Sequence, residues 1–295
     1  MKLNKPIISV IIPTYKDWDR LDLCLSALES QSIQRNKFEI IVINNDITPT
    51  PTYIKEKYKR VFFIAQQKKG SYAARNKGII YSKGSILAFT DSDCIPDKNW
   101  LLNAINSLNH KNKIYRIGGK IALFRTNSYN KKNIAEIYEY CYAFRQKEFI
   151  KKQKMAVTAN MICYKFLFEK VGLFNENLFS GGDSEWGKRA YKKGYNINYE
   201  ESVIINHPAR NSLKEILNKN RREAAGKLKT NQYTIINIII NLFLSLLPPI
   251  KSIFYINKKN TFSDILIAFT IRYLLRIDTA IEQLLVGVIK KDAKR

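Results

Sequence analysis

The 295-residue sequence predicts an α/β protein with a mostly parallel central sheet, helices on both faces of the sheet, and a helical, partly apolar C-terminal extension. Over roughly the first hundred residues, short apolar runs alternate with segments of helical periodicity, which is typical of a parallel sheet covered on both sides. Past residue 207 the chain becomes first strongly basic and then free of charge, which indicates a separate extension.

Each strand predicted in the N-terminal part is a short apolar run closed by polar or turn-forming residues. The segments between the runs place apolar residues on one helix face, as the i, i+3, i+4, i+7 spacing of Leu21, Cys24, Leu25 and Leu28 shows. The predicted strands are 7–12, 38–43, 61–64 and the run that begins at 86, and the predicted helices cover 21–28, 70–80 and 101–108.

The middle of the chain is less regular. A pair of glycines interrupts an extended segment at 117–124, and a glycine-led loop precedes a predicted helix at 186–193. We further predict a mixed charged and aromatic helix over 131–152, a strand over 157–164, and two short strands within 196–206.

Composition restricts the possible partners and compartment. The formal net charge of +25 indicates an anionic partner, which could be nucleic acid, an acidic bilayer surface or a phosphorylated substrate. The four cysteines show no paired spacing, so we expect a reducing compartment without disulfides or structural zinc. Because a strand begins by Ile7, no room is left for a signal peptide, and we expect a cytoplasmic protein.

The extension over 211–295 predicts contact with a surface. Residues 208–230 carry seven Lys and Arg against two Glu, and 233–250 carry no charge. The charge-free stretch reaches the lower limit for a membrane span, but two asparagines and Pro248-Pro249 weaken that interpretation. An amphipathic helix over 274–288 suits a membrane interface, the catalytic domain or a second subunit equally well. We therefore expect peripheral binding to the cytoplasmic face of an anionic membrane, with a homodimer through these helices as a further possibility.

Two aspartates one residue apart, Asp91 and Asp93, end the apolar run 86–89. Carboxylates just past a strand end lie where open α/β sheets bind ligands, and such a pair can share a hard divalent cation. On its own, the segment is more typical of an ordinary solvated turn.

Further motifs in order along the chain carry a resemblance. Together with Asp91-Ser92-Asp93, the sequence resembles family 2 glycosyltransferases over about 6–210, in the segments 10–15, 39–46, 70–78, 171–176 and 181–186. The resemblance implies the GT-A fold, a nucleotide-sugar donor, a divalent cation (Mn²⁺ or Mg²⁺) and inversion at the anomeric carbon. It also implies a catalytic domain at 1–210, with a nucleotide-sugar half at about 1–98 and an acceptor half at about 99–210.

The resemblance assigns donor-binding roles to the ends of the first strands. Asn44 departs from the family, which usually has an aspartate that reads the base at this position. Because an amide can donate as well as accept, and because Asp46 could replace the aspartate, uridine is still the expected base. The complete set expected to bind the nucleotide sugar is Pro13, Thr14, Tyr15, Asn44, Asp46, Arg75 and Asp91.

The resemblance also implies the metal ligands and the base. Asp93 would hold the metal, Asp91 could share it, and His207 is a candidate third ligand, although a histidine before proline is often structural. Gly182 replaces the first member of the family's acidic pair, so the base falls to Asp183, with Glu185 as the alternative. Trp186 and Trp100 are the residues assigned to acceptor binding, although a tryptophan in a helix, such as Trp186, is more often a core or rim residue.

The expected function is a metal-dependent inverting glycosyltransferase that moves a sugar from a UDP-linked donor to a glycan or lipid-linked acceptor in bacterial surface polysaccharide synthesis. Asn44 and Gly182 leave open a non-catalytic relative, and the charge leaves open a basic protein that binds nucleic acid or membranes. No recognised RNA- or DNA-binding motif supports the nucleic-acid alternative. A sugar nucleotidyltransferase would carry a glycine-rich, basic loop where Pro13-Thr14-Tyr15 stands.

Overall fold

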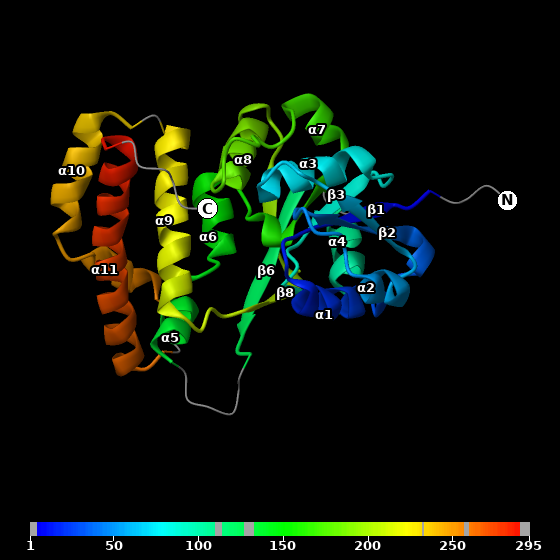
Figure 1. The fold of residues 1–295 in the computed structure, drawn as a ribbon, viewed down its shortest axis with the longest axis horizontal. Helices are drawn as coiled ribbons and strands as arrows, with labels where there is room; N and C mark the ends of the chain where they lie inside the picture. Colours follow the sequence, from blue (N-terminus) through cyan, green and yellow to red (C-terminus); the bar gives the residue numbers. More distant parts are fainter. Residues whose placement is uncertain (1–4, 110–113, 127–132, 232, 257–259, 290–295) are drawn as a thin grey trace. The chain divides into compact units, whose positions relative to one another are not determined.

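The computed structural model describes residues 5–109, 114–126, 133–231, 233–256 and 260–289 (Figure 1). The chain forms two compact units. The first comprises 1–122, 146–177 and 182–207, and the second comprises 123–145, 178–181 and 208–295. The expected boundary at 210 lies near the one at 207, but the sequence did not indicate that 123–145 belongs with the C-terminal segment.

An eight-stranded sheet forms the centre of the first unit, in the order β3-β2-β1-β4-β7-β6-β8-β5. The first four strands in this order run parallel, whereas β7 is antiparallel to both β4 and β6, and β5 is antiparallel to β8. The bounds are β1 Ile8–Thr14, β2 Phe38–Asn44, β3 Val61–Ala65, β4 Ile86–Phe89, β5 Ile95–Pro96, β6 Arg116–Phe124, β7 Met161–Tyr164 and β8 Ile197–Pro208.

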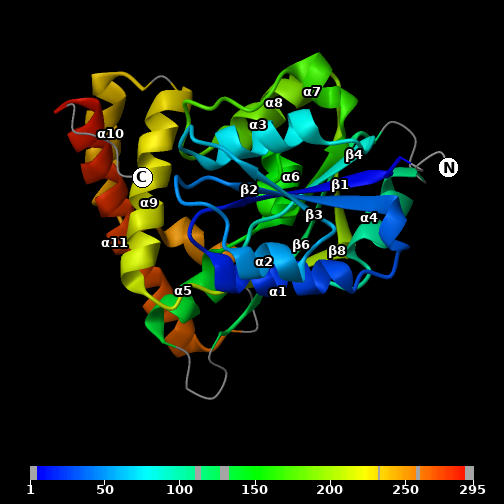
Figure 2. The ribbon, with the colours of Figure 1, turned by 45° about the vertical axis from the view of Figure 1, so that its right-hand side comes forward.

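Helices cover both faces of the parallel strands, as the sequence predicts (Figure 2). The helix α3 (Ser71–Tyr81) lies on one face, and α1 (Trp18–Glu29) and α2 (Thr52–Lys57) lie on the other. Gly78 lets α3 approach the sheet closely, because a Cβ there would lie 2.6 Å from Ile11 Cγ2. The first unit also contains α4 Trp100–Asn109, α6 Gln146–Gln153, α7 Phe166–Val171 and α8 Gly182–Lys192.

Three segments of the middle region differ from the sequence-based expectation. The helix predicted over 131–152 is two helices, α5 (Ile134–Tyr142) and α6, because Phe144 between them has a positive φ of 50° that ends helical hydrogen bonding; residues 131 and 132 lie outside the described residues. The expected strand at 157–164 begins with a 3₁₀ turn over 158–160 and becomes β7 only at 161. The two strands expected in 196–206 are one continuous strand, β8.

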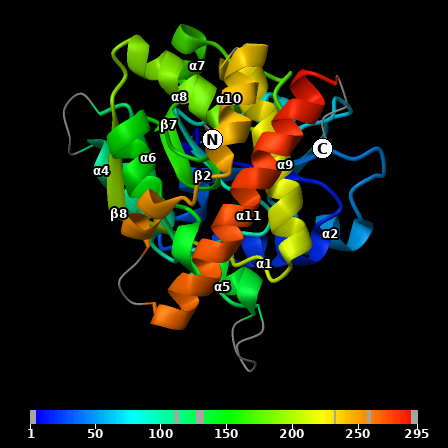
Figure 3. The same cartoon turned by 90° about the vertical axis from the view of Figure 1, so that its left-hand side faces the viewer.

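The second unit is helical. Its longest helix, α11 (Phe262–Gly287), packs against α5, α9 (Leu213–Asn231) and α10 (Ile235–Ser245), and a 3₁₀ segment, η3 (Ile250–Tyr255), follows α10 (Figure 3). None of the helices in the described part of the chain combines the length and apolar character needed to cross a bilayer. The shared core consists of Ala135, Ile137, Tyr138, Cys141, Tyr142, Ile216, Ala268, Ile271 and Leu275.

Candidate active site

The candidate site lies at the carboxyl ends of the parallel strands. The chain passes from β1 to β2 and β3 on one side and then returns to the other side of β1 with β4, so the strand order reverses between β1 and β4. In open α/β sheets ligands bind in the crevice at this reversal. Thr14 ends β1 in register with Asn44, and Asp91 and Asp93 follow the end of β4. The predicted donor-binding residues therefore share one edge of the sheet.

Asp91 is paired within the chain. Its carboxylate accepts a hydrogen bond from Arg75, a residue of α3 whose side chain is only 4% exposed. The same guanidinium lies 5.8 Å from the ring centroid of Tyr72. A buried cation requires a compensating anion, so the main role of the Asp91 carboxylate in this structure is to balance the charge of Arg75. The pair links α3 to the loop that follows β4.

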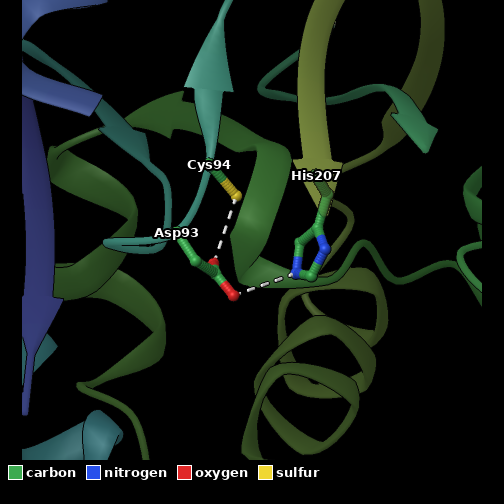
Figure 4. A group of neighbouring side chains, drawn as sticks. All are labelled: Asp93, Cys94 and His207. Atoms are coloured by element: carbon green, nitrogen blue, oxygen red, sulfur yellow. Dashed lines mark hydrogen bonds and ion pairs between the residues drawn. The ribbon is translucent and has the colours of Figure 1, made fainter. Parts of the chain in front are cut away.

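Asp93 faces His207, which lies near the end of β8 (Figure 4). The distance from Asp93 Oδ2 to His207 Nε2 is 3.7 Å. Two ligands that each lie about 2.1 Å from a Mg²⁺-sized ion are separated by at most about 4.2 Å, so these two atoms fit a single ion. The sequence predicts both residues as metal ligands, and the fold brings them together.

Cys94 is the third member of this group but suits a hard cation poorly. Its thiol lies 3.8 Å from Asp93 Oδ1 and donates a weak hydrogen bond to it. Burial, and then the negative charges of Asp93 and Asp91, raise the pKa of the Cys94 thiol well above its usual value. The neutral thiol therefore supports the Asp93 carboxylate, and oxygen and imidazole remain the fitting ligands.

Asp17 and Arg20 belong to the same cluster, although the sequence-based assignment omits them. Asp17 precedes α1 yet makes no side-chain cap; its carboxylate instead accepts hydrogen bonds from Ser92 Oγ at 3.0 Å and Arg20 Nε at 2.7 Å. Arg20 Nη1 also lies 3.7 Å from Asp93 Oδ2. An aspartate at a helix start normally indicates capping, so only the fold reveals that it faces the β4–β5 loop.

Asn44 and Asp46 shape the turn after β2. Asn44 donates its amide to the Thr48 carbonyl at 2.7 Å and accepts the Asp46 N–H at 3.1 Å. Asp46 accepts the Thr48 hydroxyl, which is the main reason why the pKa of its carboxyl is lowered, and Lys16 Nζ lies 3.9 Å from it. Both side chains thus make local hydrogen bonds that hold the turn together.

The three residues at the end of β1, Pro13, Thr14 and Tyr15, differ from one another in their exposure to solvent. The ring of Tyr15 is 62% exposed, which suits a stacking surface, and Pro13 is partly exposed. Thr14 is buried, and its Oγ1 has no hydrogen-bond partner within the described chain. Of these three residues, only Tyr15 presents a large ring to solvent.

Asp183 and Glu185 occupy the start of α8, but their surroundings differ. Asp183 Oδ1 accepts the Ser184 N–H at 2.9 Å and the Tyr72 hydroxyl at 3.3 Å. Burial raises the pKa of the Asp183 carboxyl, while these hydrogen bonds and the charge of Arg75 act in the opposite direction. The residue as a whole is half-buried.

Glu185 forms an ion pair with Arg189, which lies one helical turn further along α8. Its two carboxylate oxygens lie 2.5 and 3.0 Å from Arg189 nitrogens. Arg189 in turn donates to the carbonyls of Val171 and Leu173 at 2.6 and 2.8 Å. Glu185 therefore anchors the segment before α8, and the geometry favours Asp183 over Glu185 as a base.

The two tryptophans do not occupy acceptor-binding positions. Trp100 and Trp186 are both fully buried, so the assignment of their rings to an acceptor surface is wrong for this structure. Trp100 donates its indole N–H to Asn160 Oδ1 at 3.0 Å, and Trp186 donates to the Gly172 carbonyl at 2.8 Å. Trp186 also stacks on Phe168 with centroids 4.6 Å apart. Both rings are core residues with satisfied donors.

Comparison with known proteins identifies the family. The sequence profile described as Glycosyl transferase family 2 matches residues 9–172, which is more than half of the chain. The chain belongs to glycosyltransferase family 2. The resemblance predicted from the motifs is therefore confirmed, and so is the prediction that the protein is a transferase.

Curated relatives match over most of the chain. Glycosyltransferase AglE of Haloferax volcanii is 34% identical over 234 residues, which cover 78% of this chain and 75% of that protein. A second relative, from Methanococcus voltae, is 22% identical over 75% of this chain and 72% of its own length. Its name describes a glucuronosyltransferase that acts on a dolichyl N-acetylglucosaminyl phosphate.

Solved structures agree on the fold. Mannosyltransferase PcManGT from Pyrobaculum calidifontis, in complex with GDP-Man and Mn²⁺, superposes with a TM-score of 0.58 at 15% identity, covering 98% of this chain and 76% of that one. S. aureus TarS 1–349 in complex with UDP-GlcNAc gives 0.54 at 16% identity, covering 92% and 81%. The predicted GT-A fold is therefore confirmed.

Proposed function

We propose that this family 2 glycosyltransferase transfers a sugar, with inversion, from a UDP-linked donor to a lipid-linked or glycan acceptor in the synthesis of a surface polysaccharide. The observation that carries the proposal is the convergence of Asp93, His207 and the Asp91–Arg75 pair at one sheet edge, with Asp183 on the neighbouring α8. The name of the Methanococcus voltae relative supports a lipid-linked acceptor, and the UDP-GlcNAc bound to TarS supports a uridine donor.

The donor side would bind and orient a nucleotide diphosphate. Tyr15 offers an exposed ring for stacking, and Arg20 and Arg75 supply positive charge beside the aspartates. Asp93 and His207 are the residues that would hold a divalent cation such as Mn²⁺ or Mg²⁺, with Asp91 next to them. When bound, such an ion offsets the negative charge that develops on the leaving diphosphate.

The acceptor side would supply the base. In a single displacement, the acceptor oxygen attacks the anomeric carbon as the bond from that carbon to the diphosphate oxygen breaks, which inverts the configuration. The attacking hydroxyl loses its proton, and Asp183 takes it while the nucleoside diphosphate leaves with the bonding electrons. Burial of the Asp183 carboxyl makes it a stronger base than an exposed aspartate.

Release of nucleoside diphosphate tests the donor site. The purified full chain is incubated with a panel of nucleotide sugars and polyprenyl-phosphate-linked acceptors, with Mn²⁺ or with EDTA. We expect one donor to give cation-dependent release, and Asp93→Asn to lower the rate at least about 100-fold. Glu201→Gln, which alters a carboxylate that is 71% exposed, serves as the matched control and should act like the wild type. Cation-dependent release that is unchanged in the Asp93 variant would exclude this metal site, and no release from any donor would favour a non-catalytic relative.

We further propose that the second unit attaches the enzyme to an anionic membrane. One face of α10 exposes only apolar side chains, and η3, which follows it, exposes Ile250, Ile253 and Phe254, the last of which is 84% exposed. Sixteen Lys and Arg against six Asp and Glu within 208–295 supply the charge complementary to anionic headgroups. The exposed α10 face consists of Ile235, Ile236, Ile239, Ile240, Phe243 and Leu244.

Both ends of α10 have hydrogen bonds to terminal backbone groups, which suits a helix in an apolar environment. Thr234 and Asn237 form a capping box at its start. At its end, Arg276 of α11 donates to the carbonyls of Leu244 and Leu247 at 2.5 and 3.1 Å, and the Tyr273 hydroxyl donates to a further carbonyl. A helix fixed in this way can lie in the headgroup region with its apolar face toward the acyl chains.

A further inference from the structure

Tyr72 and Gly182 are interlocked. Tyr72 lies in the first turn of α3 and is 5% exposed, with its ring 5.6 Å from that of Phe174. A Cβ on Gly182 would lie 2.7, 2.8 and 2.9 Å from three carbons of the Tyr72 ring, distances that real Cβ atoms essentially never show. Any side chain at position 182 would therefore displace the Tyr72 ring, so the glycine is required by space.

The hydroxyl of Tyr72 makes two contacts with a single residue. It donates to Asp183 Oδ1 at 3.3 Å and accepts the backbone N–H of Asp183 at 3.3 Å. The Ser184 N–H donates to the same Oδ1 at 2.9 Å. The carboxylate is thus held at one oxygen from two directions, and this fixes the direction in which the other oxygen points.

Tyr72 also influences the charge of Asp183. The hydroxyl is itself buried, and burial together with the charge of Asp183 raises the pKa of Tyr72, so the hydroxyl stays protonated and remains a donor. Its hydrogen bond, the backbone groups of Ser184 and Thr158, and the charge of Arg75 all lower the pKa of Asp183 and oppose the stronger effect of burial. Removing the Tyr72 hydroxyl should therefore raise the pKa of Asp183 further.

We propose that Tyr72 is a positioning residue for Asp183, and that glycine at 182 serves to admit its ring. This inference rests on the proposed role of Asp183 as the base. It extends that role by naming the residue of α3 that orients the carboxylate, so that α3 serves both the donor side, through Arg75, and the base, through Tyr72.

The test is Tyr72→Phe, which removes the hydroxyl and keeps the ring that packs on Phe174. We expect kcat to fall about tenfold with little change in the KM for the donor, because an orienting hydrogen bond is lost while donor contacts remain. The acidic limb of the pH profile of kcat should move to higher pH, since a base with a higher pKa becomes protonated earlier as the pH falls. Tyr81→Phe, at the far end of the same helix and 53% exposed, is the matched control.

A second variant tests the packing of the Tyr72 ring against Gly182. Gly182→Ala should lower kcat and move the acidic limb in the same direction as Tyr72→Phe, with thermal unfolding recorded to separate misfolding from misplacement. If Tyr72→Phe leaves kcat and the pH profile unchanged while Asp183→Asn is inactive, the Tyr72 inference fails and the base assignment stands. If Asp183→Asn itself turns over normally, the proposed function of Asp183 is what fails.

Discussion

Burial acts on Asp183 more strongly than its hydrogen bonds do, and the pKa of its carboxyl therefore lies above the usual 3.8. A base must be unprotonated to accept the acceptor's proton. The raised pKa increases the affinity of the carboxylate for that proton. The Asp46 carboxyl provides a contrast, because the Thr48 hydroxyl lowers its pKa and makes it a poorer base.

The pH dependence of turnover follows from the upward shift of the pKa of Asp183. As the pH falls through the raised pKa of Asp183, the carboxyl becomes protonated and kcat should decline, with a midpoint above the 3.8 of an ordinary aspartate. Initial rates at saturating donor and acceptor across the acidic range measure this midpoint, with the cation concentration held constant. A rate that stays flat to a pH below 3.8 would show that no group with a raised pKa governs the step.

At the scale of elements, the parallel strands and their covering helices are predictable because each shows a clear hydrophobic periodicity and is ended by polar or turn-forming residues. The helix break at Phe144 was not predictable, since charged and aromatic residues continue on both sides of it. The two buried tryptophans were misassigned for a similar reason: an aromatic residue at a helix start looks the same in sequence whether its ring faces the core or the solvent. Both outcomes depend on tertiary packing.

The helix α10 carries the element-scale prediction. Replacing Ile236 and Phe243, each 67% exposed, by serine should remove most of the binding to vesicles of phosphatidylglycerol and phosphatidylcholine in a flotation assay. The fold should be unaffected, because both side chains are exposed. Leu23→Ser/Ile80→Ser alters two exposed apolar residues of α1 and α3 and should bind like the wild type.

The outcomes of that assay distinguish two possible partners of the exposed α10 face, a membrane and a second copy of the chain. Loss of vesicle binding in the α10 variant alone supports the membrane. Unchanged vesicle binding, together with a change from dimer to monomer in light scattering, would instead assign the face to a second copy of the chain. Wild-type binding to neutral vesicles as strong as to anionic ones would contradict the role of the basic residues.

At the scale of the whole molecule, the family and the GT-A fold could be predicted from the order of the motifs, and the fold brings Asp93 and His207 together, while their role in binding the donor stays a prediction. The sequence could not show that Asp17 turns toward the β4–β5 loop, or that Tyr72 reaches Asp183 across 111 positions. Such contacts depend on how the elements pack, and no local pattern encodes them. The net charge of +25 also belongs to this scale, because a charge summed over the chain favours anionic partners in general and specifies no site.

The measurement that tests the account most directly is the transfer rate of Asp183→Asn with the donor that the wild type uses. Asparagine keeps the size of the side chain and an oxygen that can accept hydrogen bonds from the Ser184 N–H and the Tyr72 hydroxyl. Binding of the nucleotide sugar should therefore persist. We expect kcat to fall about 100-fold or more, as loss of a general base requires, with the affinity for the donor retained. A variant that binds the donor and transfers the sugar at a rate near that of the wild type would contradict the assignment of Asp183 as the base.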